Sequence, residues 1–273
     1  MSKKNESLLD AAALITELQN SRKYRSLQLP AETIQDLIAH AEQITRNPRE
    51  IERIVREKLH HLVAGYLGDP DYDQLQSELK QAATDPQEIQ AICHQVLATH
   101  ASTRERLPIL EEFYPRLFAF TGTPHVLLDL ACALNPFALP WMELSPKAQY
   151  YAYDLHQPRL DAINTLFEIN HLPRLAIHQD ILVEPPSIEA DVALFFKEAH
   201  RFEARQHGCN REFWQRIHAR YLLVSLPTQN LTGNHPKIEQ HRRLVEETTA
   251  GLNWKITEIP FDNEIVFCIE KNA

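Results

Sequence analysis

Glycine is scarce in this chain of 273 residues: the whole sequence holds six, where a usage of roughly 7% is typical of proteins. Loops that bind the pyrophosphate of a dinucleotide generally contain several glycines, because the backbone must approach the phosphates closely. The scarcity of glycine therefore argues against an NAD or FAD site. The chain is nevertheless long enough for one large α/β domain and a smaller appended domain.

Long apolar runs and paired cysteines are also missing. Asp10 interrupts the only apolar run near the start, and no stretch has the composition of a signal-peptide core or a membrane span. We therefore expect a cytoplasmic protein. Cys93-His94 could form half of a metal site, but a buried cysteine on a helix is the favoured interpretation. The absence of CxxC spacing predicts neither disulfides nor a bound metal for the four cysteines, which are Cys93, Cys132, Cys209 and Cys268.

Positive charge is in deficit as well. The net charge is −9 and the pI is about 5.9, whereas a protein that binds nucleic acid is usually basic at least locally. Two regions run against this trend: residues 21–60 hold eight Lys or Arg against six acids, and residues 197–220 hold six against three. Charge alone favours two solvated helix faces over two RNA-binding surfaces.

The first hundred residues show only helical periodicity. Apolar positions recur at helical spacing over residues 8–18, 31–44, 51–62, 72–83 and 86–99. Pro30 stands where a helix start tolerates proline, and the segment from Gly68 to Pro70 is a typical helix stop. Residues 1–100 are therefore predicted to form a small all-helical N-terminal domain.

From residue 101 onward the pattern changes to an α/β one. A helix is predicted from Ser102 through Leu117. After it, strands at 125–131, 149–155, 175–178, 191–197 and 221–226 alternate with helices at 137–144, 157–170, 209–218 and 236–250. This alternation predicts a Rossmann-like, doubly wound parallel sheet over residues 101–273. The closing strands, 254–259 and 264–270, are too close together for a parallel crossover and are predicted to form an antiparallel hairpin, which is typical of methyltransferases rather than dehydrogenases.

Acidic residues lie at or just after the ends of the first three predicted strands. In open α/β sheets ligands bind beyond the carboxyl ends of the strands. Asp129 lies at the exit of the first strand. Asp154 ends the second, where an acid can accept hydrogen bonds from both ribose hydroxyls. Asp180 follows the third, where an acid can accept a hydrogen bond from the adenine amino group. The first loop, Ala131-Cys132-Ala133, lacks glycine. S-Adenosylmethionine has no phosphate and needs only small side chains there, so this donor fits the loop better than a dinucleotide does.

Two further segments bear on a methyl-donor site. Asn135-Pro136-Phe137 is similar to the NPPF motif of amino-group methyltransferases, but that motif should follow the fourth strand, so we reject this interpretation. The segment from His100 to Arg106 precedes the sheet and could fold over the donor. An arginine in it could pair with the methionine carboxylate.

Several short elements, in order along nearly the whole chain, resemble one known family. They are Ser21-Arg-Lys-Tyr24, His100 to Leu107, Asp129 to Pro136, Asp154 to Gln157, Gln179 to Leu182, Phe196-Lys197 and Ser225 to Thr228. Together they resemble the aminoglycoside-resistance 16S rRNA methyltransferases, which modify N7 of guanine 1405. Some members of that family are similar in carrying alanine at position 133.

The resemblance implies a function and a set of site residues. A monomer with no membrane association would dock its helical domain on the 30S subunit, methylate guanine 1405 from S-adenosyl-L-methionine, and so confer aminoglycoside resistance. No general base is expected, and Lys197 would orient the flipped guanine or a neighbouring phosphate. The implied donor-binding residues are His100, Thr103, Arg106, Asp129, Ala131, Ala133, Asn135, Asp154, Leu155, Asp180, Ile181 and Phe196. The implied RNA-binding residues are Arg22, Lys23, Arg25, Arg46, Arg49, Arg53, Arg201 and Lys237.

Two segments depart from the family pattern. After Phe196-Lys197 the family tends to continue with apolar residues, whereas this chain has residues 198–201, Glu-Ala-His-Arg. The family loop after Ser225 to Thr228 usually carries arginines and glycines, whereas residues 229–237 hold one glycine and little charge. Two alternatives therefore stay open: a methyltransferase of the same fold with a different RNA or small-molecule target, and a catalytically silent RNA-binding homologue.

Overall fold

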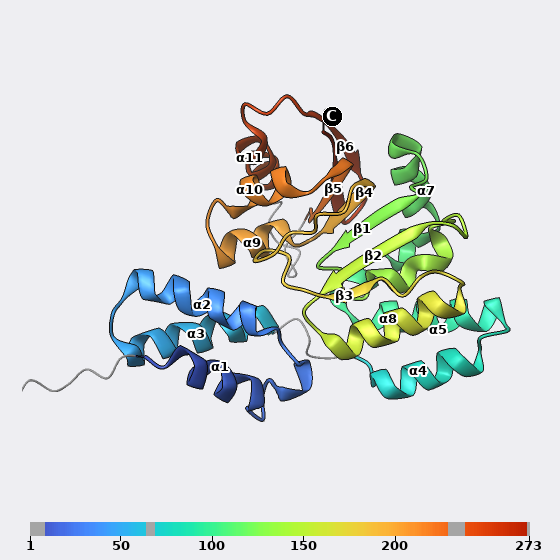
Figure 1. Cartoon of the computed structure of the whole chain (residues 1–273). Helices are drawn as coiled ribbons and strands as arrows, with labels where there is room; N and C mark the ends of the chain where they lie inside the picture. The colour runs from blue at the N-terminus through green and yellow to red at the C-terminus, as the bar shows by residue number, and fades with distance from the viewer. Residues whose placement is uncertain (1–8, 64–68, 229–237, 272–273) are drawn as a thin grey trace, which may run out of the picture.

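The first three helices form a unit with its own hydrophobic core. A computed structural model of the chain describes residues 9–63, 69–228 and 238–271 (Figure 1). Within it, α1 (Ala11–Asn20), the short 3₁₀ helix η1 (Arg25–Leu27), α2 (Ala31–Ile44) and α3 (Pro48–Val63) follow one another. Leu18, Ile34 and Val55 are fully buried between the helices. We call α1 to α3 the three-helix unit. The predicted stop at Gly68 lies outside the described residues.

The next two helices belong to the core of the sheet. α4 (Tyr72–Gln81) and α5 (Pro86–Thr99) each begin at an aspartate whose carboxylate accepts backbone N–H groups of the first turn. Leu79 of α4 and Leu97 of α5 lie in the same buried cluster as Leu127 of the first strand. The change from one hydrophobic core to the other therefore falls between Val63 and Tyr72, whereas the sequence predicted the domain boundary at residue 100.

Seven strands form one mixed sheet. They are β1 (Val126–Leu130), β2 (Gln149–Asp154), β3 (Ala176–His178), β4 (Ala190–Phe196), β5 (Ala219–Pro227), β6 (Lys255–Pro260) and β7 (Glu264–Glu270). Their order is β3-β2-β1-β4-β5-β7-β6, in which β1 to β5 pair in parallel and β7 runs antiparallel to β5 and β6. The predicted α/β sheet and its antiparallel C-terminal hairpin are both confirmed.

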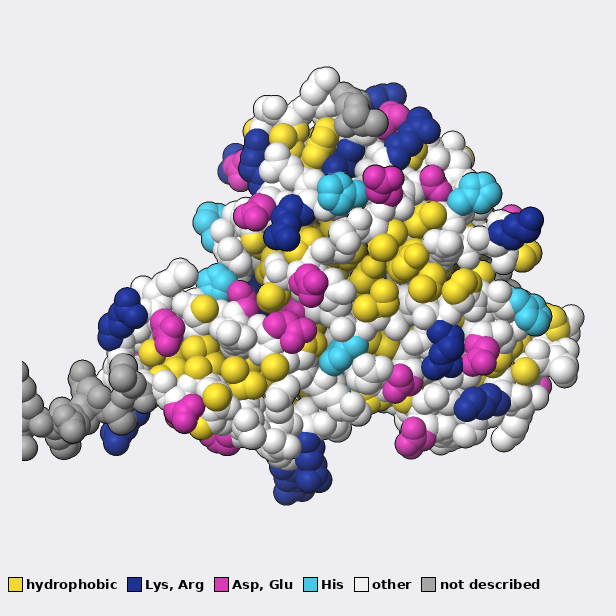
Figure 2. Space-filling model, in the orientation of Figure 1, with side chains coloured by type: hydrophobic (Ala, Val, Ile, Leu, Met, Phe, Trp, Pro, Cys, Tyr) yellow, Lys and Arg dark blue, Asp and Glu magenta, His cyan; other side chains and the backbone are white. Residues whose placement is uncertain are grey.

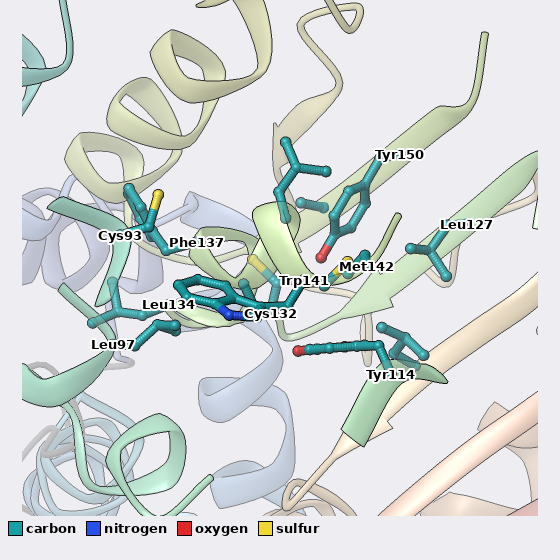
Figure 3. Packing of buried hydrophobic residues seen from close by; sticks show 14 of the residues in the cluster. Cys93, Leu97, Tyr114, Leu127, Cys132, Leu134, Phe137, Trp141, Met142 and Tyr150 are labelled. Carbon is teal, nitrogen blue, oxygen red and sulfur yellow. The ribbon is translucent and has the colours of Figure 1, made fainter. Parts of the chain in front are cut away.

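Helices cover both faces of the sheet (Figure 1). α4, α5, α7 (Leu110–Thr121) and α8 (Gln157–Ile169) pack on one face, and α9 (Ala199–Arg205), α10 (Cys209–Arg216) and α11 (Ile238–Thr249) pack on the other. Successive strand residues point to opposite faces, so Leu127 enters the first core and Leu128 the second. Figure 3 shows the core that contains Leu127, in which Trp141 and Tyr114 pack with the other buried side chains of the cluster.

Two local predictions were wrong, and one helix was missed. The helix predicted from Ser102 through Leu117 is three pieces, α6 (Ala101–Arg104), the 3₁₀ helix η3 (Leu107–Ile109) and α7, because Pro108 lacks the N–H that a continuous helix needs. The helix predicted at 137–144 is a 3₁₀ helix, η4 (Asn135–Trp141), which contains two prolines. The short helix α9 was not predicted, since seven residues are too few to show a period.

All four cysteines are buried and free. Within residues 9–63, 69–228 and 238–271, no helix combines the length and apolar character needed to cross a membrane, and no group of three potential metal ligands gathers.

Candidate functional site

Two adjoining cavities lie at the carboxyl ends of the parallel strands. The larger has a volume of about 480 Å³ and the smaller about 20 Å³, and both are lined by Ala131, Ala133 and Glu198. All twelve predicted donor-binding residues line one cavity or the other. The larger is lined by His100, Asp154, Leu155, Asp180 and Ile181, and the smaller by Thr103, Arg106, Asp129, Asn135 and Phe196. Five segments that are far apart in sequence therefore meet at one edge of the sheet.

The loop after β1 is held in a conformation that usually requires glycine. Ala131 and Ala133 have φ values of 54° and 47°, in the left-handed region. The N–H of Ala133 donates to Asp154 Oδ2 at 2.9 Å, which ties the loop to the end of β2. The backbone thus takes the path of a glycine loop although the side chains are alanines, at a cost of about 1–2 kcal/mol for each residue.

Replacing Ala133 with glycine should stabilise the fold. Relief of the left-handed strain outweighs the greater freedom that glycine gains in the unfolded chain, so we expect a rise in unfolding free energy of about 0.5–1 kcal/mol. Urea titration measures it. Ala91→Gly, at an exposed position within α5, is the matched control and should lower stability by about 1 kcal/mol. Equal losses in both variants would contradict the strain argument.

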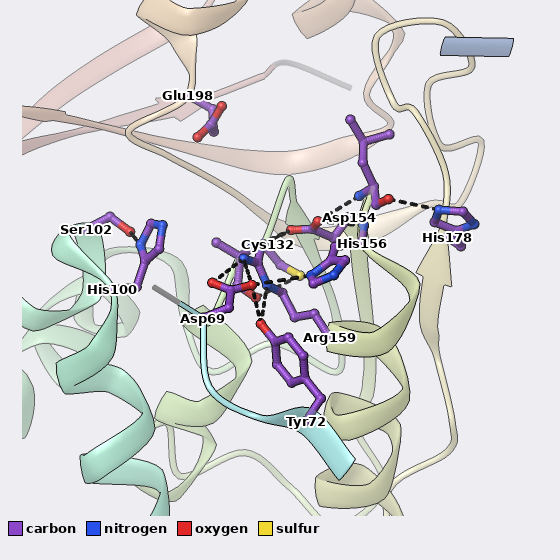
Figure 4. Close-up of polar contacts among 12 residues, drawn as sticks. Asp69, Tyr72, His100, Ser102, Cys132, Asp154, His156, Arg159, His178 and Glu198 are labelled. Atoms are coloured by element: carbon purple, nitrogen blue, oxygen red, sulfur yellow. Dashed lines mark hydrogen bonds and ion pairs between the residues drawn. The ribbon is translucent and has the colours of Figure 1, made fainter. Parts of the chain in front are cut away.

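The carboxylate of Asp154 is fixed by four hydrogen bonds (Figure 4). Oδ1 accepts the N–H groups of Leu155 at 2.7 Å and His156 at 3.0 Å, and Oδ2 accepts those of Ala133 and Arg159, each at 2.9 Å. A carboxylate offers about four acceptor positions, so all are in use. A ribose hydroxyl can therefore reach Asp154 only by sharing an oxygen with one of these donors.

Arg159 extends this network to the segment just before α4. Its guanidinium, 1% exposed, reaches Asp154 on one side and Asp69, just before α4, on the other, with an Nη2–Oδ2 distance of 2.7 Å. Burial opposes the ionisation of Asp69, yet a bond from His156 and the charge of Arg159 hold its pKa below the usual value. Neither Asp69 nor Arg159 was predicted. The only signal was the position of Arg159, two residues after the Asp154 to Gln157 motif.

Asp180 offers an acceptor atom to the larger cavity. Its side chain is buried, and Oδ1 accepts the N–H of Leu182 and a bond from Arg205. Oδ2 lies 2.8 Å from Arg205 Nη2, but without hydrogen-bond geometry, and it receives no hydrogen bond from the part of the chain that the structure describes. Such an oxygen suits an amino group such as that of adenine. Arg205 also bonds Asp36 of α2 at 2.9 Å and so links α9 to the three-helix unit.

The smaller cavity is built on a buried ion pair. Arg106 Nε lies 2.5 Å from Glu264 Oε1, and the two side chains are 3% and 0% exposed. Burial opposes the ionisation of Glu264, but the charge and hydrogen bonds of Arg106 hold its pKa below the usual value. Arg106 also stacks on Phe196, 4.3 Å from the ring centroid. The arginine expected to meet a donor carboxylate therefore already has an internal partner, which the sequence did not reveal.

Asp129 is a buried carboxyl with a raised pKa. Its Oδ2 accepts Asn135 Nδ2 at 2.9 Å and the Tyr150 hydroxyl at 2.7 Å. Burial nonetheless raises the pKa of Asp129 to about 7. Oδ1 has no bond among the described residues, so it can accept an ammonium group in the smaller cavity.

The raised pKa of Asp129 predicts how stability changes with pH. The folded state holds the Asp129 proton more tightly than the unfolded chain does, so stability falls as pH rises from about 4 to about 7. Asp129→Asn removes this titration, and the unfolding free energy of the variant should fall less over that window than that of the original protein. Urea midpoints at pH 5.0 and 7.5 test this. Parallel pH profiles for the two proteins would rule it out.

Lys197 is not presented to either cavity. Its side chain is 9% exposed, and Nζ lies 2.5 Å from Glu105 Oε2 and 3.2 Å from the Ser102 carbonyl oxygen. The Lys197 ammonium is therefore already bound by Glu105 and the Ser102 carbonyl, whereas the resemblance implied a contact with the target.

The predicted RNA-binding residues differ in their surroundings. Arg53 is exposed but forms ion pairs with Glu50 and Glu57. Arg201 lines the larger cavity and pairs with Glu198, and Lys237 lies outside the described residues. The remaining five are exposed near the two turns of the three-helix unit, and they are Arg22, Lys23, Arg25, Arg46 and Arg49.

Comparison with known proteins gives the family. The family described as ribosomal RNA methyltransferase (FmrO) matches residues 20–268. The 16S rRNA (guanine(1405)-N(7))-methyltransferase of Micromonospora echinospora is 30% identical over 266 residues, which cover 93% of this chain and 94% of the relative. The corresponding protein of Proteus mirabilis is 26% identical, with 82% and 85% covered.

Solved structures agree. The 16S rRNA methyltransferase RmtF in complex with S-adenosyl-L-homocysteine superposes with a TM-score of 0.78 at 26% identity, covering 99% of this chain and all of the other. The 16S rRNA methylase RmtB gives 0.76 at 25% identity, covering 97% and 99%. The predicted α/β methyltransferase fold is thereby confirmed, and the chain belongs to the ribosomal RNA methyltransferase (FmrO) family.

Proposed function

We propose that this protein transfers a methyl group from S-adenosyl-L-methionine to N7 of guanine 1405 of 16S rRNA. The observation that supports the proposal is the pair of adjoining cavities, whose linings include Asp154, Asp180 and Arg106. The buried Asp180 Oδ2 supplies an acceptor for the adenine amino group. Relatives bearing this enzyme name match over nearly the whole chain.

We infer one orientation for the donor from the residues that line the two cavities. Adenosine occupies the larger cavity, with its ribose at Asp154, and the amino-acid part occupies the smaller one. There the ammonium faces Asp129 and the carboxylate faces Arg106. When bound, the donor supplies an electrophilic methyl group on a sulfonium. The residues of the chain hold it in place and exclude water, which is the main source of acceleration for an in-line displacement.

The chemistry requires no proton transfer. Guanine N7 carries a lone pair and is unprotonated at neutral pH, so no side chain has to act as a base. The base must leave its stack to reach the methyl group. We propose that the protein acts as a cytoplasmic monomer on the assembled 30S subunit, where the methylated base confers aminoglycoside resistance.

The three-helix unit is the proposed contact with rRNA phosphates. Its exposed cations lie beside the α1–η1 and α2–α3 turns, although Figure 2 shows acidic side chains interspersed among basic ones on the face in view. Phosphate contacts of this kind are lost with rising salt.

Removing charge at one turn should weaken docking alone. The triple change Arg22→Ala, Lys23→Ala and Arg25→Ala is expected to lower methylation of 30S subunits about tenfold or more at 150 mM salt and to flatten the salt dependence. The dissociation constant for S-adenosylhomocysteine should not change. Arg174→Ala with Arg220→Ala, two exposed arginines of the sheet domain, is the control. Equal effects from both sets would argue against docking through the three-helix unit.

Methyl transfer to purified 30S subunits tests the whole proposal. Label from the donor should appear on guanine 1405 and at N7, and bacteria expressing the protein should resist gentamicin and kanamycin while staying sensitive to apramycin. Label at another base, or only on free RNA, would support the alternative target, which the polar residues 198–201 at the cavity favour. Failure to bind S-adenosylmethionine or S-adenosylhomocysteine would leave only a silent RNA-binding role.

A further inference from the structure

Among the described residues, Glu198 is the one charged residue shared by the two cavities of the proposed methyl-donor site. It follows Lys197 after β4 and lines both the larger and the smaller cavity, together with Ala131 and Ala133. Figure 4 shows its side chain across the site from Asp154 and His100. Under the proposed function, adenosine lies on one side of this junction and the methionine part on the other. The sulfur that joins these two parts must therefore lie at the junction.

We propose that Glu198 is a specificity residue that favours the positively charged S-adenosylmethionine over its neutral product, S-adenosylhomocysteine. The inference rests on the proposed donor site. In the transfer, guanine N7 donates its lone pair to the methyl carbon, and the electron pair of the S–C bond returns to sulfur. The positive charge thus moves from the sulfonium to the purine ring, no proton is released, and the bound product loses its attraction to Glu198.

The surroundings of Glu198 allow this role. The side chain is 18% exposed, and Arg201 Nη1 bonds Oε1 at 2.9 Å. Oε2 makes no bond within the described residues, so one oxygen can face the sulfonium. A charge pair in a largely buried site is screened less than one in water. Arg201 is itself 39% exposed on α9, so it offsets the carboxylate only in part.

The ionisation of Glu198 sets the conditions of the test. Burial raises the pKa of Glu198 to about 7, against the opposing charge of Arg201. Asp154 and Arg159 also face it, with opposite effects, and His100 lines the same cavity. Measurements should therefore be made at pH 8, where the carboxylate is ionised.

Calorimetry of the full chain with each ligand gives two dissociation constants and their ratio, product over donor. Glu198→Gln should lower this ratio roughly tenfold, which corresponds to about 1.4 kcal/mol, mainly by weakening the donor. Arg201→Gln removes the partial compensation and should raise the ratio. Glu212→Gln, an equal change of charge on exposed α10, should leave it unchanged. A purely structural role for Glu198 would weaken both ligands alike.

The outcomes separate this inference from the proposed function. If the original protein binds both ligands and the ratio does not change in Glu198→Gln or in Arg201→Gln, the charge-based selectivity is refuted while the donor site stands. If the original protein binds neither ligand, both proposals fall. Should Glu198→Gln fail to fold by circular dichroism, the rise expected for Arg201→Gln decides the question.

Discussion

Glu264→Gln is expected to lower the free energy of unfolding by roughly 3–5 kcal/mol, because it leaves the guanidinium of Arg106 buried without a counter-charge. Both side chains are almost wholly inaccessible, and the pair joins the segment before α7 to the first residue of β7. The loss follows from removing one partner of a desolvated pair, not from the strength of the pair itself. Urea unfolding monitored by circular dichroism measures it.

The same hairpin supplies a matched control. Glu258 on β6 pairs with Arg242 at 2.8 Å, but the two side chains are 37% and 35% exposed. Glu258→Gln should cost about 1 kcal/mol or less, because solvent screens an exposed pair. If both variants lost the same unfolding free energy, burial of the Arg106 pair would not explain the cost of removing Glu264.

Asp154→Ala is expected to weaken the binding of S-adenosylhomocysteine by roughly 100-fold or more. A hydrogen bond to a charged group contributes about 1.5–3 kcal/mol, and the ribose offers two hydroxyls. Calorimetry measures the change directly. Asp161→Ala, in α8 and outside the lining of both cavities, is the control and should leave affinity within about twofold.

A structural loss at Asp154 has to be separated from a lost ligand contact, because this carboxylate also holds Arg159 and the loop at Ala133. A 2′-deoxy analogue of S-adenosylhomocysteine makes the distinction. The original protein should prefer the ribose form, whereas Asp154→Ala should bind both forms alike. A preference that persisted in the variant would show that the ribose is held elsewhere.

The sheet was predictable from the sequence because its signals are local. Each strand is a short apolar run bounded by turn residues, and each of the seven appears within two residues of its predicted bounds. The close spacing of the last two strands required the antiparallel hairpin. The assignment of α4 and α5 to the sheet core was not predictable, because an amphipathic helix does not reveal which partner covers its apolar face.

The acids at the strand ends were predictable for the same reason, since their positions follow from where the strands end. Their partners were not. Arg106 and Glu264 are 158 positions apart, and Arg205 reaches Asp36 across 169. Contacts of that range depend on how the helices pack, and no period or motif encodes them. The sequence therefore predicted which residues gather at the two cavities, but not the ion pairs that hold them.

The single guanidinium of Arg205 is shared between Asp180, a carboxylate of the proposed donor site, and Asp36 of the three-helix unit. Under the proposed function, this shared contact would couple binding of the methyl donor to binding of the ribosomal subunit. A ribosomal surface that drew α2 away from Arg205 would alter donor affinity, and by reciprocity the donor would alter the affinity for the ribosome by the same factor. The order in which donor and subunit arrive would then matter for speed but not for the stability of the final complex.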